Sequence, residues 1–102
     1  MFKITIEVDE ADAVALALTG LSGPMFRQWG EHVSVDDVGF PTIRGFNEAV
    51  LYKLDFPALE QGMQVFARDY PRHWADFRRG QADMITGDVF VQCCIFGEAK
   101  YG

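Results

Sequence analysis

Residues 89–96 read VFVQCCIF, and this stretch decides which fold the sequence predicts. Apolar side chains occupy both sides of the alternation, with Val89, Val91, Cys93 and Ile95 on one side and Phe90, Cys94 and Phe96 on the other. A strand that is apolar on both faces is typical of the centre of a sheet or of a sheet covered on both sides. Because Gly87-Asp88 can form a tight turn just before it, we predict that residues 89–96 form the last strand of a sheet.

Upstream of this stretch, strand and helix patterns alternate. The expected elements are a strand at 2–8, a helix capped by Asp9 and closed by Gly20 or Gly23, a helical turn from Pro24, strands at 32–38 and 48–55, and a helix from Pro57 to Gly80 that Pro71 kinks or restarts. This order is the split βαβ pattern (β-α-β-β-α-β). It predicts an α+β, ferredoxin-like fold in which an antiparallel sheet carries two helices on one face and leaves the other face open.

Length and composition limit the class of protein. A chain of 102 residues has room for one domain, expected to cover residues 1–102. Its longest apolar run, Ala13–Leu18, is far shorter than a membrane span, and its N-terminus lacks the apolar core of a signal peptide. The two adjacent cysteines, Cys93 and Cys94, are poor partners for a disulfide with each other. We therefore expect a cytoplasmic protein with reduced thiols and no membrane contact.

The net charge of −6 points to a class of partner. Proteins that bind nucleic acid or anionic lipid directly need an excess of Lys and Arg, so neither is expected to bind this chain. An acidic surface suits a basic protein partner, such as a nucleic-acid-binding protein or complex. The candidate partner-binding residues are the carboxylates that gather near the first helix and the second strand: Asp9, Glu10, Asp12, Glu31, Asp36 and Asp37. Helix-dipole stabilisation explains the first three equally well.

Three other clusters leave their roles open. His73 lies at helical spacing from Asp69 and Asp76, which suits a general base or a metal ligand, but Pro71 interrupts the geometry. His32 accompanies the carboxylates of its loop without the spacing of a calcium site. Four arginines lie near two aromatic residues, and they could bind an anion or form an ordinary solvated helix face: Arg68, Arg72, Arg78 and Arg79 with Tyr70 and Trp74.

Motifs for catalysis or for cofactor binding are absent, so no catalytic residue, cofactor or metal is predicted, and whether the protein is an enzyme is left open, with a non-enzymatic role favoured. The first third of the chain is similar to small phage virion-morphogenesis proteins in its order of a short strand, an Ala/Leu-rich helix and a helical turn ending near RQWGEH at 27–32. That resemblance implies a structural phage component and assigns no site residue.

The sequence thus supports three hypotheses. The first is a non-enzymatic acidic protein-binding module, a small inhibitor or immunity-type protein such as a phage-encoded, anti-CRISPR-like antagonist, which docks on the basic nucleic-acid-binding surface of a target protein. The second is a ferredoxin-like homodimer that binds or transforms a small molecule, because dimerisation would cover the open sheet face. The third is a structural component of a phage virion.

Overall fold

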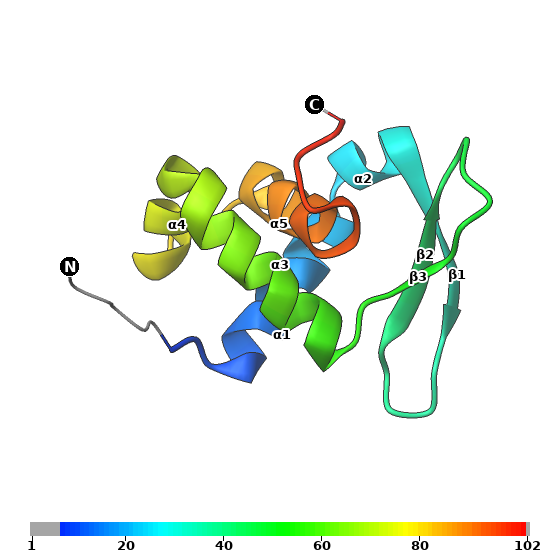
Figure 1. The fold of residues 1–102 in the computed structure, drawn as a ribbon, viewed down its shortest axis with the longest axis horizontal. Coiled ribbons are helices and arrows are strands. Elements are labelled where there is room, and N and C mark those ends of the chain that lie inside the picture. The colour runs from blue at the N-terminus through cyan, green and yellow to red at the C-terminus, as the bar shows by residue number, and fades with distance from the viewer. Residues whose placement is uncertain (1–6, 102) are drawn as a thin grey trace.

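The computed structural model describes residues 7–101 and has an α+β architecture. Its elements, in chain order, are α1 (Glu10–Leu21), α2 (Pro24–Trp29), β1 (Gly30–Val35), β2 (Pro41–Gly45), β3 (Tyr52–Lys53), α3 (Phe56–Asp69), α4 (Pro71–Arg78) and α5 (Met84–Phe96). Most of the helices gather on one side of the molecule, and the small sheet stands at the other end (Figure 1). The α+β class is therefore confirmed. Of the strand expected at 2–8, residues 2–6 lie outside the described residues.

The stretch that was expected to be the last strand is a helix. Residues 89–96 form most of α5, and the expected turn at Gly87-Asp88 lies inside the same helix. The Asp83 carboxylate caps its start by accepting a hydrogen bond from the Thr86 amide at 2.9 Å, and Gly97 ends it in the left-handed conformation at a φ of 75°. A helix enclosed by other helices is apolar on most sides, so its sequence lacks the polar face that would have revealed its period.

The ferredoxin-like order is not found in the described part of the chain. There the three strands follow one another directly and pair antiparallel in the order β1-β2-β3. The strand expected at 32–38 is confirmed as β1, although it begins earlier and ends at Val35, and the strand expected at 48–55 shrinks to Tyr52–Lys53. The strand β2 lies between these two expected strands, where no strand was predicted. Pro41 and Gly45 at its ends are residues that usually mark turns, and they concealed it.

Two ion pairs lie on the surface of the sheet. Glu31 and Arg44 lie opposite each other on β1 and β2 and form an ion pair there. Lys53 on β3 makes a second ion pair with Asp36, at 2.7 Å. On the inward face the Ile43 side chain is completely buried. Val33 and Val35 of β1 and Val38 of the following turn are nevertheless exposed, so apolar side chains also reach the surface at this end of the molecule.

The other helices were predicted from capping residues and prolines at their starts. Asp9 caps α1 by accepting a hydrogen bond from the Ala11 amide at 2.8 Å, and Asp55 caps α3 by accepting from Ala58 at 3.1 Å. Pro71 restarts the chain as α4, because proline lacks the amide hydrogen and forces the preceding Tyr70 out of helical geometry. The predicted restart at Pro71 is therefore confirmed.

The core is centred on α5, which packs between α1 and α3. At the first contact Gly20 of α1 meets Gly87 of α5, and at the second Gly62 of α3 meets Cys94 of α5. Each contact is so close that a β-carbon on the glycine would overlap the facing helix. The buried apolar side chains of the helices and the sheet form one continuous cluster around these contacts.

Removing the α5 cap should weaken the protein in a pH-dependent way. The Asp83→Ala variant is expected to lose about 1 kcal/mol of unfolding free energy at neutral pH, because the amide of Thr86 loses its acceptor. The same hydrogen bond lowers the pKa of Asp83 below its usual value of 3.8. Its stabilising effect is therefore present above that pH and is lost as the pH falls through the lower folded-state pKa.

Urea unfolding of the wild type and of Asp83→Ala, at neutral pH and at about pH 3, checks this prediction. The difference between the two proteins should shrink at acid pH. The exposed carboxylate of Asp37, in the turn between β1 and β2, provides the matched control Asp37→Ala. An Asp37→Ala loss as large as that of Asp83→Ala would contradict the capping argument.

Candidate functional site

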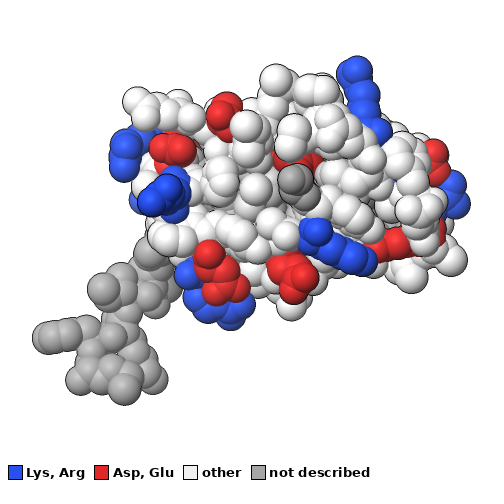
Figure 2. All heavy atoms as spheres, turned by 90° about the horizontal axis from the view of Figure 1, so that it is seen from above, with Lys and Arg blue, Asp and Glu red and all other residues white. Residues whose placement is uncertain are grey.

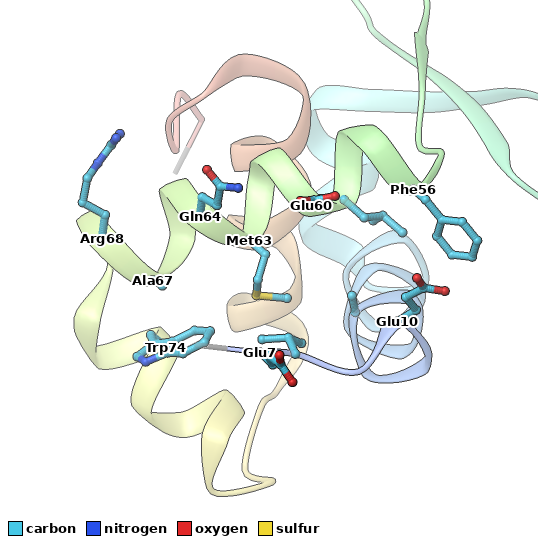
Figure 3. Close-up of a pocket in the computed structure, with 12 residues that line it drawn as sticks. Glu7, Glu10, Phe56, Glu60, Met63, Gln64, Ala67, Arg68 and Trp74 are labelled. Carbon is cyan, nitrogen blue, oxygen red and sulfur yellow. The ribbon is translucent and has the colours of Figure 1, made fainter. Parts of the chain in front are cut away.

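A groove of about 780 Å³ lies between the start of α1, the length of α3 and the start of α4 (Figure 3). We call it the α1–α3 groove. Its apolar floor consists of buried and half-buried side chains: Val8, Ala13, Leu59, Met63, Ala67 and Trp74. Its rim consists of exposed side chains: Glu7, Glu10, Phe56, Glu60, Gln64 and Arg68. An apolar floor surrounded by polar residues is the general form of a binding surface.

The rim of the α1–α3 groove is acidic. Within the described residues, no ion pair joins Glu7, Glu10 or Glu60 to a basic side chain. Arg68, the single cation of the rim, is bound by its neighbour Asp69 through two hydrogen bonds of 2.8 and 2.9 Å. This pairing lowers the pKa of Asp69 and raises that of Arg68. In Figure 3 the Arg68 side chain also points away from the hollow. Arg78, which does not line the groove, lies at its edge, where its guanidinium donates to the Glu7 carbonyl oxygen at 3.5 Å. The lining residues themselves therefore carry three carboxylates and one paired cation.

The α1 half of the predicted acidic set lies at this groove. Glu10 belongs to its rim. Asp9 serves as the cap of α1, so its carboxylate already has a structural task. Asp12 borders a second, smaller hollow of about 350 Å³, where Arg78 is also present. The structure thus places one of these three carboxylates directly at the groove and the other two beside it.

The sheet half of the predicted set lies elsewhere. Glu31 is paired with Arg44. Asp36 is paired with Lys53 and also accepts hydrogen bonds from backbone amides of its own turn, at 2.8 and 3.1 Å. The Lys53 ammonium lowers the pKa of Asp36. Figure 1 shows that the turn between β1 and β2, which also carries Asp37, stands apart from the start of α1. The two halves therefore do not form one surface.

Most of the groove could not be found from the sequence. Leu59, Met63 and Trp74 all lie in the helix expected from Pro57 to Gly80; the first two are buried and Trp74 is half-buried. Glu60 was not singled out, although its position one residue after Leu59 places it beside the apolar row of α3. The neighbourhood of α1 and α3 is set by tertiary packing, and no spacing along the chain indicates it.

Two of the four arginines in the predicted basic cluster, Arg68 and Arg78, already have partners within the chain. Arg78 lies over the ring of Trp74, with the guanidinium 5.5 Å from the ring centre. Trp74 also contacts Phe66 and Phe77 as part of the core edge. On the face seen in Figure 2, basic and acidic side chains lie interspersed, and neither sign forms a continuous patch. Arg68 is already bound to Asp69.

The histidines are not arranged for acid–base or metal chemistry. Nδ1 of His73 lies 3.1 Å from the Thr86 hydroxyl oxygen rather than at Asp69. That hydroxyl belongs to a buried residue and is closed to a substrate. The ring of His32 packs against Phe26, at 5.2 Å between ring centres. Across residues 7–101, no three His, Cys, Asp or Glu side chains come together in a group that could hold a metal ion.

The two cysteines are free thiols. Burial raises the pKa of Cys93 to about 12 and also raises that of Cys94. The thiolate is the nucleophilic form of cysteine, so these thiols are not activated nucleophiles. Cys94 instead serves packing, because it fills the contact with Gly62.

A buried polar network ties α2, α5 and the C-terminal segment together. The Asp88 carboxylate accepts hydrogen bonds from the Trp29 indole and from the Gln92 amide, both at 2.8 Å. The same Gln92 side chain binds the backbone of Tyr101 through two further hydrogen bonds, of 2.7 and 2.8 Å. The Tyr101 ring stacks on Trp29. Every member of this network has its partners inside the protein, so it stabilises the fold and offers no free group to a ligand.

The chain was compared with protein families, curated proteins and solved structures. The chain matches no protein family model, no curated protein and no solved structure. In the part of the chain that the structure describes, none of the helices combines the length and the apolar character needed to cross a membrane.

Proposed function

We propose that this protein is a non-enzymatic binding module that docks on a basic surface of another protein. The observation that carries the proposal is the α1–α3 groove, in which an apolar floor lies beside three carboxylates that have no ion-pair partner among the described residues. Burial of the apolar side chains that remain partly or fully exposed, Trp74 on the floor and Phe56 on the rim above all, would supply affinity. The carboxylates would select a partner that presents Lys and Arg around an apolar centre.

The proposal extends to the role of the partner. Surfaces dense in Lys and Arg are typical of proteins that bind nucleic acid. A module that occupies such a surface excludes the nucleic acid and so acts as an inhibitor, in the way that an immunity-type or anti-CRISPR-like protein acts. The net charge of −6 supports this role, because a negatively charged protein is steered toward the surface that nucleic acid would otherwise reach.

Charge reversal in the rim tests the proposal. We expect that the wild-type protein, used as bait, captures a basic protein from a lysate of its source cells, and that high salt weakens the capture. The double variant Glu10→Lys/Glu60→Lys should lose most of that protein, because it replaces two attractive contacts by two repulsive ones. Quantitative mass spectrometry of the captured proteins provides the measurement.

A matched control separates an effect of the groove on capture from an effect of the net charge. Glu98→Lys changes the charge of an exposed residue that does not line the groove, and it should retain the partner. Asp37→Lys tests the turn of the sheet in the same way. If the rim variant and the wild type captured the same proteins in the same amounts, or if Asp37→Lys alone abolished capture, the groove would not be the docking site. Release of nucleic acid from the captured partner would support the inhibitory role.

A further inference from the structure

The α1–α3 groove is walled by helices. Apart from Glu7 and Val8, every residue that lines it belongs to α1, α3 or α4. Backbone groups inside a helix are already hydrogen-bonded to each other. An extended peptide gains much of its affinity from main-chain hydrogen bonds to the edge of a sheet, and the sheet stands at the other end of this molecule (Figure 1). The groove therefore offers little to an extended chain.

A helix needs no such backbone partner. The apolar residues of α3 in the groove recur one turn apart, at Leu59, Met63 and Ala67, and the polar row of Glu60 and Gln64 follows beside them. The lined part of α3 begins at Phe56 and ends at Arg68, which corresponds to about 18 Å of helix. A helix of about three turns matches this length and would bury an apolar face of the same period.

The charge of the rim determines the polar face of that helix. Glu7 and Glu10 lie on the α1 side of the groove and Glu60 lies on α3 (Figure 3). Carboxylates on both sides favour Lys or Arg on both flanks of the apolar stripe. A second copy of this chain would bring a net charge of −6 to the same rim and is therefore disfavoured.

We propose that the α1–α3 groove binds a basic amphipathic helix of the partner protein, about three turns long, with its apolar stripe on Phe56, Ala67 and Trp74, which keep exposed apolar surface. This inference rests on the proposed function and specifies the form of the partner at the same site. The bound helix packs parallel to the row of apolar residues on α3, and its Lys and Arg side chains reach Glu10 and Glu60.

Three synthetic peptides of about 14 residues test the inference on the full-length protein. The first has Leu at i, i+3, i+4 and i+7 spacing with Lys elsewhere. The second has the same composition with two central prolines, which prevent a helix but keep the charge. The third has Glu in place of Lys. We expect the first to bind at least about tenfold more tightly than the other two in fluorescence anisotropy.

The two tryptophans provide a readout of position. Trp74 lines the groove, whereas Trp29 is buried in the Asp88 network. In NMR spectra the indole signal of Trp74 should shift on addition of the first peptide, and that of Trp29 should stay. The Glu10→Lys/Glu60→Lys variant should weaken the first peptide about tenfold, whereas Glu98→Lys should change its affinity less than about twofold.

The inference is overturned if the proline peptide binds as well as the helical one, if no peptide binds, or if Trp74 does not respond. These outcomes are distinguishable from failure of the proposed function. A partner that the rim variant loses from the lysate, together with failure of the helical peptide, would leave the docking role standing and reject a helical occupant. If the Glu10→Lys/Glu60→Lys variant kept both the partner and the helical peptide, the docking role of the groove and the helical occupant would both be rejected.

Discussion

Gly87→Ala is expected to destabilise the protein by about 3 kcal/mol, although alanine normally favours a helix over glycine. A β-carbon at position 87 would lie 2.5 Å from the amide nitrogen of Gly20 and 2.8 Å from its α-carbon. The atoms that it meets belong to the backbone of α1, and a backbone cannot rotate away as a side chain can. Helices α1 and α5 would have to separate, which would open the core on both sides of the contact.

Urea unfolding followed by circular dichroism measures this effect. Ala15→Leu provides the control, because it adds a larger group at an exposed position of α1. We expect the control to change the unfolding free energy by less than about 0.5 kcal/mol. A Gly87→Ala variant as stable as the wild type would show that the two helices are not in backbone contact.

The same contacts explain why the fold was only partly predictable. Where a local group determines the structure, the sequence predicted it: Asp9 and Pro57 mark helix starts, and Pro71 marks a restart. The helix at 84–96 depends instead on enclosure by α1 and α3, which lies outside its own sequence. Its nearly continuous apolar run at 89–96 suits a buried strand and a buried helix equally.

The candidate site was likewise predictable only where a local signal exists. Glu10 was singled out because acidic residues at the start of a helix are visible along the chain. Glu60 and Met63 were not, because they join the site only when α3 comes to rest beside α1. The carboxylates of the β1–β2 turn were grouped with those of α1 on charge alone. The structure places them on separate elements and pairs Asp36 with Lys53.

Asp88→Ala is expected to lower the unfolding free energy by about 3 kcal/mol at neutral pH. The substitution removes the acceptor of the Trp29 indole and of one Gln92 amide hydrogen, and both donors lie in the interior. A buried donor without a partner has lost its hydrogen bond to water and gained none in the protein. Gln92 also anchors Tyr101, so the C-terminal segment should loosen together with α2.

The pH dependence of stability shows whether burial of the Asp88 charge or the hydrogen bonds to Asp88 has the larger effect on its pKa. Burial raises the pKa of this carboxyl above 3.8, and the hydrogen bonds from Trp29 and Gln92 oppose that shift only in part. Protonation of Asp88 is therefore easier in the folded state than in the unfolded state. Its contribution to stability is fully present below the unfolded-state pKa and decreases as the pH rises through the folded-state pKa, opposite to the effect expected for Asp83.

Asp88→Asn isolates the titration of this carboxyl, because asparagine has nearly the same shape and does not titrate. Its NH2 group cannot accept from one of the two donors, and that loss is the same at every pH. We expect the stability of the wild type relative to Asp88→Asn to fall as the pH rises from about 3.5 toward neutral and then to remain level. Urea titrations at a series of pH values, followed by tryptophan fluorescence, provide the measurement. If the relative stability rose with pH instead, the two donated hydrogen bonds would outweigh the burial of the charge, and the network would hold Asp88 as an anion throughout.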